Sequence, residues 1–192
     1  MADFPFQAPQ VLKATHQTDR FDCGKAPLNE FSQRYALMGA QSGNSRTFVV
    51  VDGEDQVVGY YSLAAAAIEH EDAPPRVTQG QPRYPLPAIL MARFAVDGSQ
   101  QGQGLGLALF RDALVRSLHI TDDLGARAFV VDAKDDAAAR FYAKFGMMEA
   151  PSREAAGSGT GLDSGETAMP NSHPTRRLYL LFKDVKKIVA GG

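Results

Sequence analysis

The apolar positions of this chain change period several times, and each change marks a predicted element. Short apolar runs bounded by turn residues predict strands at 11–12, 46–51, 57–68, 87–96, 127–132 and 177–182. Apolar residues at helical spacing predict amphipathic helices over 26–40, 105–118 and 135–145. Strand and helix therefore alternate in the second half of the chain.

The first half has two further features. The helix predicted over 26–40 has Pro27 in its first turn and one apolar face, formed by Leu28, Phe31, Tyr35 and Met38. The segment 69–87 contains five prolines and is predicted to be a loop. Because such a loop is long for a compact domain, we expect it to face a substrate.

A glycine-rich turn follows the strand predicted over 87–96. Gly102, Gly104 and Gly106 surround the start of the next helix at Leu105. Glycine lets a ligand approach the backbone closely. The first N–H groups of a helix have no partner within it, and the helix dipole is positive at that end. The turn is therefore a candidate phosphate site.

Known phosphate-binding patterns distinguish between ligands. A Walker loop ends in Gly-Lys-Ser/Thr and a dinucleotide fingerprint has a third glycine, and Leu107 breaks both patterns. Gln101, Gly104 and Gly106 match the pattern Gln/Arg-x-x-Gly-x-Gly/Ala instead. This pattern resembles the acetyl-CoA pyrophosphate loop of the GNAT acetyltransferase superfamily. A turn that serves packing alone is the alternative.

A second motif lies on the helix predicted over 135–145. The run 138–147 resembles the signature A-x-x-F-Y-x-x-x-G-F of the same superfamily, through Phe141, Tyr142 and Gly146. Two motifs in this order are more specific than either motif alone. The chain from Arg46 to Phe182 is therefore similar to the GNAT superfamily.

The resemblance implies an α+β fold in three layers, a mixed central sheet flanked by helices. Its fourth and fifth strands, which end at Val96 and near Asp132, are expected to splay apart. The pantetheine arm of acetyl-CoA is expected in the gap, with the Val96 N–H facing the thioester oxygen as an oxyanion donor. The implied cofactor-binding residues are Phe94, Ala95, Val96, Gln101, Gly102, Gln103, Gly104, Leu105, Gly106 and Tyr142.

Tyr142 is predicted to act in catalysis together with Val96. A phenol is protonated near neutral pH because its ordinary pKa is about 10, whereas that of a thiol is about 8.5. Tyr142 is therefore expected to protonate the CoA thiolate as it leaves. The alternative is that Tyr142 packs in the core beside Phe141.

No general base stands out in the sequence, since the four histidines, His16, His70, His119 and His173, lie outside both motifs. An α-amine has an ordinary pKa of about 7.7–8.0, so a fraction of it is neutral at cellular pH. A lysine amine, at about 10.4, needs a base. These values favour an α-amine as the acceptor.

Asp135 departs from the superfamily pattern, which often has Asn seven residues before the motif tyrosine. An ionised carboxylate cannot donate a hydrogen bond. We therefore expect Asp135 to cap the helix that follows it rather than to contact pantetheine.

Composition narrows the class of protein. The 192 residues, 44% of them hydrophobic, fit one domain with a sizeable core. The net charge of −2 gives no support to a strongly nucleic-acid-binding protein, although it leaves room for a local basic patch. The sequence shows no signal peptide and no bilayer-spanning run. The single Cys23 has no Cys or His at metal-ligand spacing; it is expected to be a buried or half-buried small residue rather than a nucleophile, and no metal site is predicted.

The end of the chain changes character. Residues 152–174 are rich in Gly and Ser, which predicts a flexible insertion within a single domain over 1–192. The strand over 177–182 is expected to close the sheet. Lys183, Lys186 and Lys187 are expected to form a solvated basic tail.

Further short segments of the sequence make the resemblance more specific, from the GNAT superfamily to one subgroup within it. They are 21–24 with Leu28 and Phe31, then 43–46, 59–61, 92–97, 102–106 with Asp112 and Ala113, and 141–146. Together they resemble the GNAT toxins of bacterial toxin–antitoxin pairs, which acetylate the α-amine of aminoacyl-tRNA and so block translation. The insertion at 152–174 departs from this subgroup. A tRNA ligand requires local cations, and Arg46, Arg83 and Arg93 are the predicted contacts.

The subgroup implies a cytoplasmic enzyme that uses acetyl-CoA and is often a homodimer. It also implies a DNA-binding antitoxin as the partner of this enzyme. Two alternatives stay open. One is an ordinary GNAT enzyme that acetylates a small-molecule amine or a protein N-terminus. The other is a non-catalytic CoA-binding module.

Overall fold

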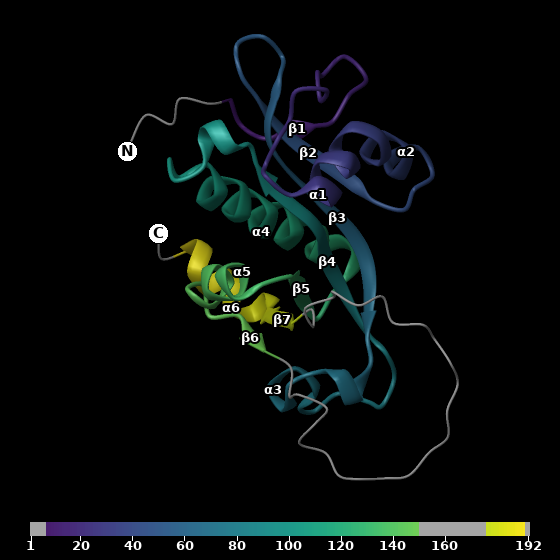
Figure 1. Ribbon diagram of the computed structural model, residues 1–192. Helices are drawn as coiled ribbons and strands as arrows, with labels where there is room; N and C mark the ends of the chain where they lie inside the picture. Colours follow the sequence, from purple (N-terminus) through teal and green to yellow (C-terminus); the bar gives the residue numbers. More distant parts are fainter. Residues whose placement is uncertain (1–6, 150–175, 191–192) are drawn as a thin grey trace, which may run out of the picture.

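The computed structural model describes residues 7–149 and 176–190. A seven-stranded sheet runs through them in the order β1-β2-β3-β4-β5-β7-β6 (Figure 1). Within this part of the chain, β4 and β5 are parallel and every other neighbouring pair is antiparallel. The sheet is therefore mixed, as the resemblance implied.

The first four strands form an antiparallel meander with these bounds: β1 (Gln10–Val11), β2 (Arg46–Val51), β3 (Val57–Ile68) and β4 (Leu86–Val96). Asp52 closes the hairpin between β2 and β3. Its N–H donates to the Gln56 carbonyl, and its carboxylate accepts from the N–H groups of Glu54 and Gln56. One aspartate thus satisfies several backbone groups of a tight turn.

A helical segment packs on one face of the meander. It consists of α1 (Ala26–Glu30), the π-helical turn η1 (Phe31–Tyr35) and α2 (Ala36–Gln41). The buried residues are Leu28, Ser32 and Ala36. Tyr35 and Met38, predicted on the buried face, are 49% and 60% exposed. That prediction was wrong because a π-helical turn is wider than an α-helical one and shifts the period.

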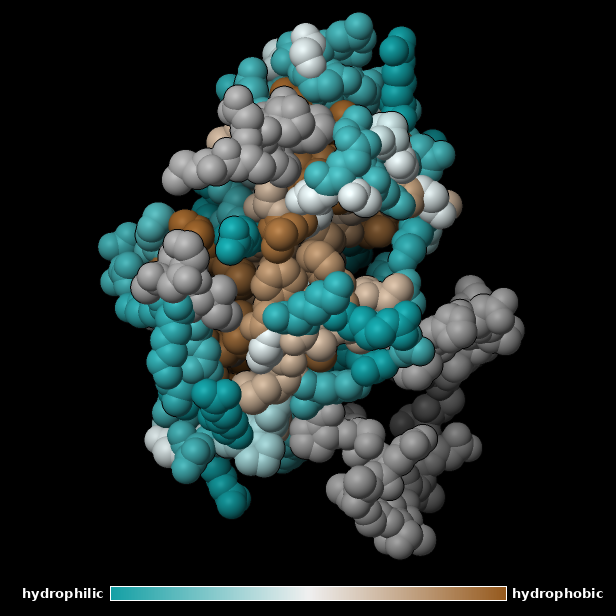
Figure 2. All heavy atoms as spheres, turned by 90° about the vertical axis from the view of Figure 1, so that its left-hand side faces the viewer, coloured by the Kyte–Doolittle hydropathy of each residue, from teal (hydrophilic) through white to brown (hydrophobic). Residues whose placement is uncertain are grey.

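The second half alternates strand and helix, with these bounds: α4 (Leu105–Leu124), β5 (Ala128–Ala133), α5 (Asp136–Ala143), β6 (Met148–Glu149), β7 (Arg176–Leu181) and α6 (Phe182–Ala190). Helix α4 connects the parallel strands β4 and β5. It lies on the side of the meander opposite to α1 and α2 (Figure 1). On the left-hand side of Figure 1, where α4 and α5 lie, apolar residues gather at the centre of the surface and polar residues surround them (Figure 2).

Two apolar clusters hold the helices on the two faces. Tyr61 packs in the cluster that includes α4, and Tyr60 packs in the cluster that includes α1 and α2. These neighbours on β3 face opposite sides because side chains alternate along a strand. A Cβ at Gly59 would lie 2.8 Å from a terminal methyl of Leu109, so glycine at this position lets α4 approach β3 closely.

Strands β4 and β5 pair over part of their length. Their register runs from Ala88 opposite Ala128 to Met91 opposite Val131. Beyond Met91, β4 continues to Val96 with β3 as its only strand partner among the described residues. The two strands therefore splay apart and leave a gap, which confirms the expected architecture.

The end of the chain differs from the sequence prediction. Strand β7 does not close the sheet, because β6 pairs with its outer edge. Lys183, Lys186 and Lys187 belong to α6 instead of a tail. Phe182 and Val185 are buried at helical spacing. The charges between these two apolar positions hid the short amphipathic pattern.

The connection between β3 and β4 also differs from its prediction. The predicted loop over 69–87 contains the short helices η2 (His70–Asp72) and α3 (Pro75–Thr78). The insertion predicted at 152–174 lies outside the described residues, and the single domain over 1–192 stays a prediction. In the part of the chain that is described, no helix combines the length and apolarity that a membrane crossing requires.

The start of α4 provides a stability test on two glycines. Gly104 has a φ of +88°, which residues with a side chain rarely adopt. A Cβ on Gly106 would meet Phe94 and Val96 at an ordinary 3.7 Å. We expect Gly104→Ala to lower the free energy of unfolding by about 1–2 kcal/mol. We expect Gly106→Ala to raise it by about 0.5–1 kcal/mol. Urea denaturation measures both, and equal effects would contradict the two backbone conformations.

Candidate active site

A cleft of about 310 Å³ lies where β4 and β5 diverge. Residues from the N-terminal segment, β4, the glycine-rich turn and α5 line it, among them Cys23, Lys25, Phe94, Val96, Gln101, Asp135, Phe141 and Tyr142. A recess of about 70 Å³ shares Lys25, Phe94 and Tyr142 with the cleft and extends to Arg93 and Lys134. The two cavities thus meet at Tyr142.

Strand β4 presents backbone groups to the cleft. The Asp97 N–H donates to the Val58 carbonyl on β3. Hydrogen-bonded pairs alternate with non-bonded pairs along an antiparallel ladder. By the register of β3 and β4, Val96 and Phe94 belong to the non-bonded pairs. Their N–H and C=O groups therefore point away from β3 and toward the gap.

Tyr142 reaches the cleft from α5. It is 6% exposed, and its ring packs against Phe94, Phe110 and Phe141. Burial, and to a smaller extent the charge of Asp135, raises the pKa of its phenol well above the usual range. No group in the described part of the chain hydrogen-bonds to its hydroxyl. Tyr142 is therefore a protonated donor without a partner beside a cavity.

Asp135 precedes α5 and has two partners. One carboxylate oxygen accepts from the Ala138 N–H at 2.8 Å, which confirms the helix cap expected from the sequence. The other accepts from Lys25 Nζ at 2.6 Å. The hydrogen bond from Lys25 and that from the helix backbone lower the pKa of Asp135. The carboxylate is therefore ionised at neutral pH, with both oxygens engaged.

The glycine-rich turn ends at the N-terminus of α4, as the sequence predicts. Gly104 is the N-cap, and no side chain caps the first turn. The first backbone N–H groups of α4 therefore lack a side-chain acceptor, the condition for an anion site. The Gln101 side chain points away from this turn. Its Nε2 donates to the carbonyls of Cys23 at 3.2 Å and Val96 at 3.0 Å.

The N-terminal segment borders the cleft because it is tied to the end of β4. The Asp22 N–H donates to Asp97 Oδ2 at 2.9 Å, and the Gly98 N–H donates to the Asp22 carbonyl at 2.8 Å. Burial acts to raise the pKa of Asp97, but hydrogen bonds from Asp22 and Ser99 outweigh it and hold the pKa below the usual value. Sequence reasoning missed this contact because no local pattern links residues 75 positions apart.

Cys23 is half-buried in the wall of the cleft, as its sequence context led us to expect. Its Sγ donates to Asn29 Oδ1 at 3.1 Å. Burial raises the pKa of the thiol. Because the thiolate is the reactive form of cysteine, the raised pKa makes Cys23 a poor nucleophile.

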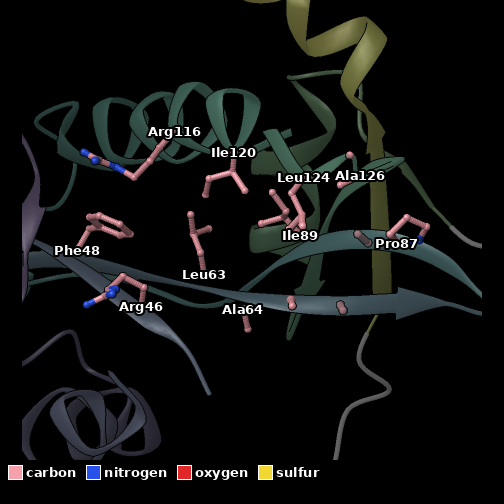
Figure 3. Close-up of a pocket in the computed structure, with 14 residues that line it drawn as sticks. Arg46, Phe48, Leu63, Ala64, Pro87, Ile89, Arg116, Ile120, Leu124 and Ala126 are labelled. Atoms are coloured by element: carbon pink, nitrogen blue, oxygen red, sulfur yellow. The ribbon is translucent and has the colours of Figure 1, made fainter. Parts of the chain in front are cut away.

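The three arginines predicted to contact tRNA lie in different places. Arg93 lines the recess beside Tyr142, with its guanidinium 5.3 Å from the centre of the Phe31 ring. Arg83 is exposed in the connection before β4. Arg46 lines a separate groove on the α4 side of the sheet (Figure 3). Of the three, only Arg93 lies at the cleft.

The groove that Arg46 lines has a volume of about 680 Å³ and lies between α4 and strands β3 and β4 (Figure 3). Its walls are mainly apolar, with Phe48, Leu63, Ile89, Ile120 and Leu124 among them. At one end the Arg116 guanidinium lies 4.2 Å from the centre of the Phe48 ring. It also donates to Asp112 and to the Tyr61 hydroxyl. Sequence reasoning did not anticipate this groove.

Fold and cleft together define the class of protein. A mixed sheet with two splayed strands, an uncapped glycine turn and a buried tyrosine at the gap match the expectations for an acetyltransferase. Residues 43–146 match the acetyltransferase (GNAT) domain family. The chain is also 39% identical, over 147 residues, to a tRNA-acetylating toxin of Mycobacterium tuberculosis; the match covers 76% of this chain and 87% of that protein.

The chain therefore belongs to the GNAT acetyltransferase family. It is an N-acetyltransferase that takes its acetyl group from acetyl-CoA, as the sequence predicts.

Solved structures share the fold. AtaT complexed with acetyl-methionyl-tRNAfMet has a TM-score of 0.76 at 22% identity, covering 95% of this chain and 98% of that one. A tyrosine-to-phenylalanine mutant of KacT has a TM-score of 0.76 at 20% identity, covering 95% and 99%. AtaTR bound with AcCoA has a TM-score of 0.72 at 24% identity, covering 95% and 97%.

Asp97 provides a test of the docked N-terminal segment. Asp97→Ala removes the acceptor for the Asp22 N–H and for Ser99. We expect the free energy of unfolding to fall by about 1–3 kcal/mol, and Cys23, the only cysteine, to react faster with a thiol reagent. The exposed Asp123→Ala is the control and should change stability by less than about 0.5 kcal/mol. Unchanged thiol reactivity in Asp97→Ala would show that the segment docks without this carboxylate.

Buried tyrosines predict how stability depends on alkaline pH. Burial is the main cause that raises the pKa of Tyr60, Tyr61 and Tyr142. Above pH ~10 the unfolded chain therefore binds fewer protons than the folded chain, and stability falls as pH rises. We expect a loss of about 1.4 kcal/mol per pH unit for each tyrosine. Urea unfolding from pH 9 to 11 measures it. Because burial also raises the pKa of Tyr179, Tyr142→Phe should reduce the slope by about one quarter. A flat profile would contradict the burial of these phenols.

Proposed function

We propose that this protein is the toxin of a toxin–antitoxin pair, and that it acetylates the α-amine of aminoacyl-tRNA and so blocks translation. The observation that carries the catalytic part is the Tyr142 hydroxyl, which is protonated and without a partner beside the cleft. The choice of substrate is supported by the relative at 39% identity, a tRNA-acetylating toxin. The AtaT complex with acetyl-methionyl-tRNAfMet has the same fold.

Acetyl-CoA binds in this proposal along the gap between β4 and β5. The backbone of Phe94, Ala95 and Val96 pairs with the pantetheine arm, and the outward direction of the Phe94 and Val96 N–H groups supports this. The pyrophosphate lies on the turn formed by Gln101, Gly102, Gln103, Gly104, Leu105 and Gly106. The uncapped start of α4 supports that position.

In the reaction, the acceptor amine attacks the thioester carbonyl. The Val96 N–H donates to the oxygen that becomes negative. The amine loses a proton to water, and the carbon–sulfur bond breaks as Tyr142 gives its proton to the departing sulfur. The Tyr142 phenolate then takes a proton back from water. Burial makes a phenol a weaker acid, but it also raises the pKa of a thiol in the same cleft. The two shifts therefore act in the same direction.

The acceptor follows from the absence of a base. Among the described residues that line the cleft and the recess there is no histidine. Both carboxylates there have partners, Asp135 in Lys25 and the helix cap and Asp132 in Arg177. An α-amine, with an ordinary pKa of about 7.7–8.0, reacts without a base more readily than a lysine amine. Arg93 is placed to meet the phosphate backbone of the acceptor near Tyr142, with Arg46 and Arg83 as more distant contacts.

We also propose a DNA-binding antitoxin as the protein partner, a homodimer and a cytoplasmic location. The partner is supported by two proteins of the same fold. One is an AtaT mutant bound to the C-terminus of the antitoxin AtaR, and the other is the KacTA–DNA complex.

Tyr142→Phe tests the mechanism. The hydroxyl has no partner in the described structure, so we expect the fold to remain and kcat to fall about 10²–10⁴-fold. The assay follows labelled acetyl groups from acetyl-CoA to a pool of charged tRNA, with uncharged tRNA and free amino acids as controls. Label on small amines or peptides instead of charged tRNA would make the protein an ordinary acetyltransferase. An unchanged rate in Tyr142→Phe would remove the proposed acid.

A further inference from the structure

Lys25 stands at the cleft although it belongs to the N-terminal segment. Its Nζ lies 2.6 Å from Asp135 Oδ2, so it crosses from this segment to the start of α5. It lines both the cleft and the recess. Its side chain is 51% exposed, so the ammonium faces open space as well as Asp135.

A count of hydrogen-bond donors sets Lys25 and Tyr142 apart from the other side chains of the cleft, and the Tyr142 hydroxyl is already assigned to the departing sulfur. Gln101 uses its side-chain amide on the carbonyls of Cys23 and Val96. The Cys23 thiol donates to Asn29. Asp135 is ionised and cannot donate. Lys25 carries three N–H groups, of which the carboxylate of Asp135 takes one.

Acetyl-CoA needs hydrogen-bond donors on the wall of the cleft that faces β4. Its pantetheine arm contains amide groups, each with a carbonyl acceptor that water hydrates in solution. A carbonyl that enters the cleft without a new partner costs free energy. Strand β4 supplies backbone N–H groups from one wall. On the facing wall Asp135 supplies acceptors only and the Tyr142 hydroxyl serves the departing sulfur, so Lys25 is the side chain left to meet a carbonyl of the arm.

We propose that Lys25 is a positioning residue for the acetyl donor, and that its ammonium donates to an amide carbonyl of the pantetheine arm while it stays bound to Asp135. Asp135 pairs with the ammonium and caps α5. The inference rests on the proposed binding of acetyl-CoA between β4 and β5. It assigns the N-terminal segment, held by Asp97 and Gln101, a direct part in the donor site.

The test compares Lys25→Met with Asp135→Asn. Both substitutions remove the ion pair, and asparagine still caps a helix, but only Lys25→Met removes the ammonium. We expect the Kd for CoA, measured by calorimetry, to rise about 10- to 100-fold in Lys25→Met, the range for a hydrogen bond to a charged group. The rise in Asp135→Asn should be less than about threefold. In Lys25→Met the KM for acetyl-CoA should rise while kcat stays nearly constant.

A shortened ligand separates the arm from the phosphates. Adenosine 3′,5′-diphosphate lacks the pantetheine arm, so Lys25→Met should bind it as the wild type does. Lys25→Gln, which keeps an N–H donor, should recover part of the affinity for CoA. Equal losses in Lys25→Met and Asp135→Asn would assign Lys25 a structural role and overturn the inference. Equal losses for both ligands would place Lys25 at the phosphates, with the same consequence.

The wild type is the reference for the proposed function itself. If it does not bind CoA, the proposed donor site fails, and the role of Lys25 fails with it. If the wild type binds CoA and Lys25→Met binds it equally well, the inference about Lys25 alone is wrong.

Discussion

An aromatic cluster between β4, α4 and α5 holds the two central strands apart, and the rest of the site depends on it. Phe94 stacks on Phe141 with ring centres 5.9 Å apart, and Phe110 packs against Phe141, Tyr142 and Phe145. Rings of this size prevent α5 from closing on the end of β4. The backbone of β4 therefore keeps unpaired N–H groups beside Tyr142, which a continuous ladder would have consumed.

Polar groups on β3 tie the two helical layers to the sheet. The Tyr60 hydroxyl donates to the Leu28 carbonyl of α1, and the Tyr61 hydroxyl donates to Asp112 of α4. Arg116 donates to both members of the second pair. Each phenol is buried and satisfied, so each layer has a defined position as well as an apolar contact. Tyr142 is the contrast, because its buried hydroxyl faces a cavity instead of a partner.

The charges around the cleft show how the local charge of a site differs from the total charge of the chain. The net charge is −2, yet the acidic groups near Tyr142 already have partners. Asp135 is paired with Lys25, and Asp132 with Arg177 at 2.7 and 2.9 Å. Arg93 lies in the recess among these neutralised acids. The local field near a site depends on such pairs, which composition does not report.

Local patterns in the sequence determined the elements and the two motifs. The strands, the turn at Asp52, the glycine start of α4 and the cap at Asp135 depend on residues within a few positions of each other. For the same reason the family resemblance, which rests on such runs, identified Tyr142 and Val96 as candidates. Even there the regular period failed at Tyr35 and Met38, where a π-helical turn intervenes.

The tertiary structure alone decided which distant residues complete the cleft. Lys25 meets Asp135 across 110 positions, and Asp97 holds Asp22 across 75. The tertiary structure also places Arg46, Arg83 and Arg93 in different parts of the molecule, although the sequence analysis had grouped them as predicted tRNA contacts. The physical reason is that a period or a motif carries information about one element. Contacts between elements depend instead on how the strands pair and where they diverge.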